Sequence, residues 1–117
     1  MKDCIFCKIA EEKNITEDYI YENNNFFSVF DISPQIQGHA LVISKKHFPT
    51  ILEIPLEESK ELLDCIQKTS KILCEKFGIK DFNVVTNSGK HAGQIIHHVH
   101  FHILPRKERD NFQIFKK

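Results

Sequence analysis

The chain has 117 residues, a length typical of one domain with a single modest hydrophobic core. Its 16 Lys and Arg residues are balanced by 16 Asp and Glu residues, which argues against a basic surface for duplex nucleic acid. No apolar run approaches the roughly 20 residues of a membrane span, and the first residues lack the apolar segment of a signal peptide. We therefore expect one domain over residues 1–117, cytoplasmic, without membrane or nucleic-acid partners.

The N-terminal part predicts a short helix followed by three strands. Apolar residues near the N-terminus recur at helical spacing, and strand-forming residues follow them. Three consecutive asparagines suit a tight hairpin, because asparagine tolerates the left-handed backbone. The expected elements are a helix at 4–12, a turn at 14–17, strands at 19–22 and 26–30, a loop at 31–38 and a strand at 39–44.

The C-terminal part predicts one long helix between strands. Pro55 suits the first helical turn and Gly78 the end of the helix. A stripe with a 3.6-residue period is formed by Leu62, Leu63, Ile66, Leu73 and Phe77. A strand at 81–86, a polar loop at 87–94 and a strand that ends at Pro105 follow. This order predicts an α+β fold with an antiparallel sheet of about five strands and the long helix across one face.

Segment 97–106 (HHVHFHILPR) carries histidines at every second position, namely His98, His100 and His102. Successive side chains of a strand point to opposite faces, so we expect these imidazoles on one face and the apolar residues between them toward the core. Imidazoles that titrate near neutral pH can serve as nucleophile, proton donor or metal ligand. The outer two lie roughly 13 Å apart along a strand, which indicates divided roles rather than one shared metal. A sheet face that is rich in histidine by chance is the alternative.

The four cysteines divide into two kinds. Cys65 and Cys74 fall within the helical pattern, where a free cysteine behaves as a small core residue. Cys4 and Cys7 form a C-x-x-C motif, whose spacing lets two thiolates reach one metal ion. A redox motif would follow a strand, and no strand is expected before Cys4. The pair is therefore half of a metal site or two incidental thiols.

These segments together resemble the histidine triad (HIT) superfamily. The run from His98 to Leu104 fits the alternation His-φ-His-φ-His-φ-φ, where φ is apolar. The remainder is similar to the small histidine triad nucleotide-binding (Hint-type) branch and its bacterial relatives, through segments 4–9, 30–35, 38–47, 87–89 and 92–94. The resemblance implies a HIT-like homodimer that hydrolyses nucleoside 5′-phosphoramidates or related nucleotidyl substrates and releases a nucleoside monophosphate.

The resemblance also assigns roles to single residues. His100 takes the position of the nucleophile, which forms a nucleotidyl-histidine that water then hydrolyses. His102 stands beside it on the phosphate, and His98 and His39 complete the catalytic group. The implied contacts of a purine nucleotide are Asn87, Gly93, Gln94 and Ile95 for the phosphate, Asp31 and Ile32 for the ribose, and Ile5, Phe6, Ile9, Val29 and Leu41 for the base. The base-slot residues could equally belong to the core.

One position departs from the Hint-type pattern. Position 95 is Ile, where that branch often has Ser or Thr to assist the phosphate or the leaving group. A hydroxyl is lost there and the backbone N–H remains. The departure bears on the rate of phosphoramidate hydrolysis rather than on nucleotide binding.

Bacterial relatives with the C-x-x-C motif tend to bind a structural zinc ion, and the matching residues here are Cys4, Cys7, His47 and His98. Four protein ligands close a tetrahedral shell, so such a site is structural. The alternatives to a phosphoramidate hydrolase are a dinucleoside polyphosphate hydrolase, a nucleotide-binding regulatory module with little turnover, and a zinc-dependent structural protein. For the homodimer, we expect the long helices and the edge strand at 81–86 to pair.

Overall fold

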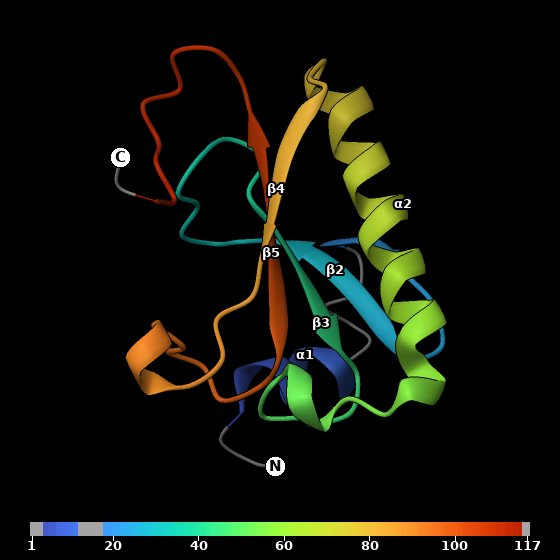
Figure 1. Cartoon of the computed structure of the whole chain (residues 1–117). Coiled ribbons are helices and arrows are strands. Elements are labelled where there is room, and N and C mark those ends of the chain that lie inside the picture. The colour runs from blue at the N-terminus through green and yellow to red at the C-terminus, as the bar shows by residue number, and fades with distance from the viewer. Residues whose placement is uncertain (1–3, 12–17, 116–117) are drawn as a thin grey trace.

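The computed structural model describes residues 4–11 and 18–115, so the turn expected at 14–17 lies outside the described residues. Five strands form one antiparallel sheet in the order β1-β2-β3-β5-β4. The elements are α1 (Ile5–Glu11), β1 (Tyr19–Glu22), β2 (Phe26–Phe30), β3 (Ala40–Ser44), α2 (Ser59–Phe77), β4 (Asp81–Val85) and β5 (His100–Arg106). Figure 1 shows α2 along one face of the sheet. The predicted α+β fold is confirmed.

Alternating side chains of the central strands build one apolar cluster on each face of the sheet. Phe26 and Val42 face α2 and pack with Cys65, Leu73 and other residues of the larger cluster. Their chain neighbours Phe27 and Ile43 face the other way and pack with Phe6 of α1. Because both faces carry apolar side chains, α1 and α2 are both needed to cover the sheet.

Helix α2 begins later than its sequence indicates and buries fewer of its leucines. Residues Leu56–Glu58 form a 3₁₀ turn after Pro55, and the α-helix starts at Ser59. At the other end Gly78 adopts φ 63°, and its N–H donates to the carbonyl of Cys74. Leu63 was expected in the buried stripe, but its side chain is 55% exposed because it lies on the flank of the helix. That part of the prediction is wrong.

Strand β5 starts and ends differently from the prediction. It begins at His100, so His98 precedes the strand, and it continues through Pro105 to Arg106. Pairing with β3 ends at Ile103, and Pro105 pairs only with Phe82 of β4. Proline has no backbone N–H to donate. It is tolerated there because β5 is no longer paired with β3 at this position, so no hydrogen bond to β3 is lost.

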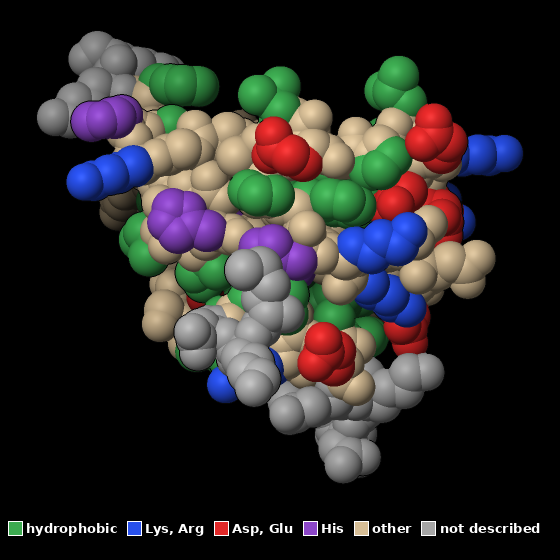
Figure 2. Space-filling view, turned by 90° about the horizontal axis from the view of Figure 1, so that it is seen from below, with side chains coloured by type: hydrophobic (Ala, Val, Ile, Leu, Met, Phe, Trp, Pro, Cys, Tyr) green, Lys and Arg blue, Asp and Glu red, His purple; other side chains and the backbone are tan. Residues whose placement is uncertain are grey.

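No helix within residues 4–11 and 18–115 has the length and apolar character required to cross a membrane. On the face shown in Figure 2, histidine and apolar side chains are exposed beside one another.

Candidate active site and metal cluster

A cavity of about 700 Å³ opens on the face of the sheet opposite α2. The register places His100 opposite Ile43 and His102 opposite Leu41, so both imidazoles share a face with the α1-side apolar cluster. Most of the sequence-predicted site residues line this cavity: Ile5, Phe6, Ile9, Val29, Asp31, Ile32, His39, Leu41, Asn87, Gly93, Ile95, His100 and His102. The volume lies within the usual range for small-molecule sites.

The imidazole of His100 is fixed in one tautomer. Its Nδ1 lies 2.7 Å from the carbonyl oxygen of His98. A carbonyl can only accept, so Nδ1 carries the proton and donates, and Nε2 of the neutral ring keeps its lone pair. Phe6 packs against this ring edge to face, with 5.0 Å between the centroids. His100 thus presents a base or a nucleophile within the cavity.

A chain of hydrogen bonds sets the proton positions on two further histidines. The backbone N–H of Gln35 donates to Nδ1 of His39 at 3.1 Å, so a neutral His39 carries its proton on Nε2. That Nε2 lies 2.8 Å from Nδ1 of His102 and donates to it. His102 therefore holds its own proton on Nε2. The chain makes His102 a hydrogen-bond donor next to His100, and their centroids are 5.1 Å apart.

Burial keeps these two rings uncharged. It lowers the pKa of His102 to about 4, and the neighbouring charges of His100 and His39 act in the same direction. Burial also lowers the pKa of His39, although the carboxylate of Asp31 partly offsets this effect. Near neutral pH both rings are neutral, so the tautomers inferred from their hydrogen bonds are the forms present.

Asp31 and Ile32 lie at the rim of the cavity on the loop after β2. Oδ1 of Asp31 accepts from the backbone N–H of Ser33 at 2.9 Å, and Oδ2 lies 3.6 Å from Nε2 of His39. Ile32 is 98% exposed. Asp31, His39 and His102 also stand within 4.8 Å of one another, but the two ring nitrogens that face each other are already joined by a hydrogen bond.

Gln94 does not line the cavity. Its amide NH₂ donates to the carbonyls of Pro49 and Ile96, and its side-chain oxygen accepts from the N–H of Gly89. These bonds hold the loop after β4 in shape, with its 3₁₀ turn at Lys90–Ala92. Next to it, Ile95 is 88% exposed at the cavity rim and offers no hydroxyl.

Sequence reasoning missed several residues of the cavity wall. Leu104 continues the same-face alternation beyond His102, a signal that the pattern of the strand contains. The other missed residues stand in loops or at element ends, where no periodicity indicates them: Phe30, Ser33, Gln35, Val85, Ile96, Phe112, Gln113 and Ile114.

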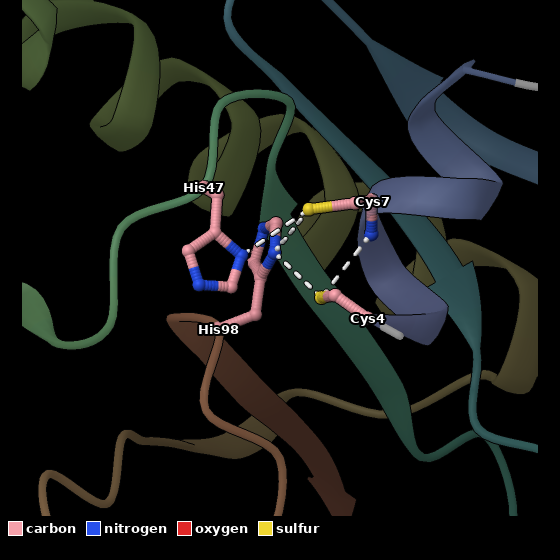
Figure 3. Close-up of side chains that lie close together, drawn as sticks. All are labelled: Cys4, Cys7, His47 and His98. Carbon is pink, nitrogen blue, oxygen red and sulfur yellow. Dashed lines mark hydrogen bonds between the residues drawn. The ribbon is translucent and has the colours of Figure 1, made fainter. Parts of the chain in front are cut away.

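The structure brings Cys4, Cys7, His47 and His98 together from three separate chain segments (Figure 3). Sγ of Cys4 lies 3.2 Å from Nδ1 of His98, and Sγ of Cys7 lies 3.2 Å from Nδ1 of His47 and 3.4 Å from Nδ1 of His98. A tetrahedral zinc ion with usual bond lengths separates sulfur and nitrogen ligands by about 3.5 Å. The four residues can therefore hold one metal ion.

The surroundings of the cluster suit a cation. Nε2 of His98 donates to the carbonyl oxygen of Ser44 at 2.7 Å, which leaves the lone pair of Nδ1 directed at the two thiols. Burial raises the pKa of the Cys7 thiol, with further contributions from Cys4, so a cation is needed to stabilise a thiolate here. Both ring nitrogens of His98 are thus engaged outside the cavity, and His98 does not line it.

Comparisons with known proteins agree with this geometry. The HIT domain family matches residues 12–109, which include the histidine row. The chain belongs to the HIT family. This HIT protein is 41% identical over 107 residues to a HIT-like protein of Methanocaldococcus jannaschii, with 92% of this chain and 81% of that protein covered.

Of two further relatives, one has a named activity and the other a solved structure. An adenosine 5′-monophosphoramidase of Schizosaccharomyces pombe is 36% identical over 107 residues, which cover 92% of this chain and 77% of that protein. The crystal structure of a HIT-family protein of Bacillus subtilis superposes with a TM-score of 0.88 at 34% identity, covering 98% of this chain and 82% of the other.

Proposed function

We propose that this HIT protein hydrolyses nucleoside 5′-phosphoramidates or related nucleotidyl substrates through a covalent bond to His100. The observation that carries the proposal is the hydrogen bond from Nδ1 of His100 to the carbonyl of His98, which leaves Nε2 unprotonated in the cavity. A hydrolase acting on nucleotides also agrees with the phosphoramidase among its relatives.

In the proposed reaction, Nε2 of His100 attacks the α-phosphorus and the phosphorus–nitrogen bond to the leaving amine breaks. The amine takes up a proton from solvent as it departs, and a nucleotidyl-His100 remains. Water then attacks the same phosphorus and loses a proton to solvent, the bond to Nε2 breaks, and the nucleoside monophosphate and neutral His100 are released. The Nε2 proton of His102 donates to a phosphate oxygen on which negative charge builds up in both steps.

The remaining cavity residues suit the other parts of a nucleotide. The carboxylate of Asp31 can accept from the two ribose hydroxyls, and the neighbouring Ile32 covers the sugar. The base slot between α1 and β2, which includes Phe6 and Leu41, takes a flat purine. Asn87 and the backbone at Gly93 and Ile95 stand on the phosphate side. Gln94 would act there only by holding the loop.

We further propose that Cys4, Cys7, His47 and His98 bind a structural zinc ion. When bound, zinc supplies folding free energy and fixes the four ligands, because a complete shell of protein ligands leaves no open position for water. The chain's own residues then connect cluster and cavity, since Phe6 stands between Cys4 and Cys7 in the sequence and packs on both His98 and His100.

A nucleotide-binding module with little turnover is the second candidate. It is favoured by the exposed Ile95, which presents no hydroxyl to the phosphate or the leaving group. Such a module would use the same cavity and the same nucleotide contacts, without a covalent step.

Release of AMP from adenosine 5′-phosphoramidate tests the two candidates. We expect wild-type turnover, a loss of at least ~10³-fold in His100→Ala, and AMP affinity within about tenfold of wild type, as for a group that acts in the transition state. His91→Ala, in the exposed loop after β4, is the matched control and retains turnover. AMP binding without any release would support the binding module, and turnover near wild type in His100→Ala would exclude His100 as the nucleophile.

A further inference from the structure

The cavity offers a nucleotide almost no formal charge. Among the described residues that line it, Asp31 is the only one of the types Asp, Glu, Lys and Arg. Two of the histidines that line it, His39 and His102, are held neutral because burial lowers the pKa of each. A chain of two or more phosphates would therefore enter a partly buried site that contains a carboxylate and no lysine or arginine.

One arginine lies close to the cavity, but its guanidinium already donates hydrogen bonds to other residues of the protein. Arg106 ends β5 on the same face as His102 and Leu104, four and two residues before it. Its guanidinium donates to both carboxylate oxygens of Asp110, at 2.7 and 3.0 Å. It also donates to the side-chain oxygen of Asn83 at 2.8 Å and to the carbonyl of Phe112. These bonds occupy the fork that would otherwise bind a phosphate.

Asp110 holds the C-terminal segment against the cavity while it neutralises Arg106. Its side chain is only 7% exposed and accepts from the backbone N–H groups of Lys107 and Phe112, at 3.1 and 3.2 Å. The guanidinium also lies 5.2 Å from the ring centroid of Phe112. As a result, Phe112, Gln113 and Ile114 form an uncharged part of the cavity wall. Figure 1 shows this segment on the side of the sheet away from α2.

We propose that the Arg106–Asp110 pair is a specificity-determining device, which restricts the cavity to nucleotides with a single phosphate and an uncharged or amine leaving group. This inference rests on the proposed function, because it assumes that a nucleotide occupies the cavity. With Arg106 neutralised, each additional phosphate brings negative charge to a site that cannot compensate it, and the loss of hydration opposes binding. Nucleoside oligophosphates and dinucleoside polyphosphates are thereby disfavoured.

The affinities of AMP and ATP, measured by calorimetry in magnesium-free buffer, test the proposal without requiring turnover. We expect the wild-type protein to bind ATP at least about tenfold more weakly than AMP. Asp110→Asn removes the charge that neutralises Arg106 and keeps one side-chain oxygen, which can still accept from one of the two backbone N–H groups. In that variant the ratio of the AMP affinity to the ATP affinity should decrease about five- to tenfold, because the guanidinium can then attract the β- and γ-phosphates.

Two further variants separate this effect from a general disturbance. Asp64→Asn removes the acid of another pair at i,i+4 spacing, Asp64–Lys68 on α2, and should leave the AMP-to-ATP ratio unchanged. The double variant Asp110→Asn with Arg106→Gln should restore the wild-type ratio, because no cation is left to attract the phosphates.

Equal affinity of the wild-type protein for AMP and ATP would overturn the inference, and this result does not depend on any variant folding. An unchanged ratio in a folded Asp110→Asn protein would overturn it as well. A protein that prefers AMP but does not hydrolyse the phosphoramidate would contradict the proposed hydrolysis and leave this inference standing.

Discussion

The tautomers of the cavity histidines are set by backbone groups, because a carbonyl can only accept a hydrogen bond and an N–H can only donate one. The carbonyl of His98 fixes the proton of His100 on Nδ1, and the backbone N–H of Gln35 fixes the proton of His39 on Nε2. The proton position of His102 is then set by His39, through the 2.8 Å hydrogen bond between the two rings. No positive charge is needed to orient the three rings, which agrees with their partial burial.

The lowered pKa of His102 leads to a pH-dependent stability. An unfolded histidine has a pKa near 6.5, and in the folded protein that of His102 is about 4. Between these values the unfolded chain binds the proton and the folded chain does not, so stability falls as the pH decreases from about 6.5 to about 4. One such group contributes a slope of at most about 1.4 kcal/mol per pH unit.

We therefore expect His102→Asn to flatten this part of the stability profile, as measured by urea unfolding between pH 7 and pH 4.5 at constant metal content. His91→Asn, whose side chain is exposed, is the control and should keep the wild-type slope. Parallel profiles for His102→Asn and wild type would contradict a neutral, buried His102.

At the residue scale, the sequence predicted which residues lie close together but not which hydrogen bonds their side chains make. Alternation along the strand was sufficient to place His100 and His102 on one face. It could not show that both nitrogens of His98 are engaged at Ser44 and the cysteines, or that the amide of Gln94 donates to the carbonyl of Pro49 instead of entering the cavity. Those orientations depend on groups from distant segments.

At the element scale, the C-terminal end of α2 and the loop after β2 meet at Gly38. This glycine adopts φ +83°, and a Cβ there would lie 2.8 Å from Cε2 of Phe77 and 3.1 Å from Cγ of Pro105. Both neighbours are rings that pack between helix and sheet, and they cannot move aside without disturbing that packing. The close approach explains why the loop that carries Asp31 needs glycine at this position.

Gly38→Ala should therefore destabilise the protein by about 2–4 kcal/mol, through backbone strain and overpacking together. Gly78→Ala is the matched control, since Gly78 also has positive φ but a Cβ at this position would meet no atom within 4 Å. It should lose only about 1 kcal/mol. Equal losses of both variants in thermal unfolding would show that the contact with Phe77 and Pro105 carries no cost.

Helix α1 contains one of the four proposed ligands, Cys7, and directly follows another, Cys4, so a bound metal ion would fix its position. We expect chelation, or Cys4→Ser, to lower the melting temperature by several degrees, since the unfolded chain does not hold the ligands together. Turnover should fall only modestly. Cys74→Ser, a half-buried cysteine of α2 outside the cluster, is the control and should keep the shift on chelation.

The opposite order would contradict a structural ion: activity lost completely on chelation with little change in melting temperature. Freshly purified protein that contains no zinc by elemental analysis would contradict zinc binding itself. His98→Ala should reduce both stability and turnover, because loss of the imidazole opens the cluster that holds the segment whose backbone carbonyl orients His100.

The order and type of the regular elements were predicted from periodicity, and so were the bounds of β1 and β2, whereas those of α2 and β5 were not. The proline inside β5 and the 3₁₀ turn before α2 depend on where neighbouring strands and helices end, which local patterns do not contain. The C-terminal segment has no periodic pattern at all. Its position depends on the contact of Asp110 with Arg106, a pairing that many charged residues of the chain could have made.

At the scale of the whole molecule, β4 is an edge strand with an exposed apolar face. Among the residues that the structure describes, it pairs only with β5, and the side chains of Phe82 and Val84 are each 42% exposed. An open edge of this kind invites pairing with another chain. We expect a two-fold symmetric dimer through β4 and α2, in which each apolar edge covers the other.

Sedimentation at micromolar concentration should give about twice the 13.7 kDa mass of the chain. Val84→Lys should shift the protein toward the monomer, because the charge would be buried in the interface. Leu52→Lys, at an exposed apolar position between β3 and α2, is the control and should leave the dimer intact. A wild-type protein that sediments as a 13.7 kDa monomer would contradict the expected assembly.

The central claim is that Nε2 of His100 forms a covalent bond to phosphorus. Mass spectrometry of protein that is denatured during turnover of adenosine 5′-phosphoramidate tests it most directly. We predict a mass increase of one adenylyl group on the peptide that contains His100, and no increase in His100→Ala. AMP that accumulates without any adduct, or an adduct on another residue, would contradict the account.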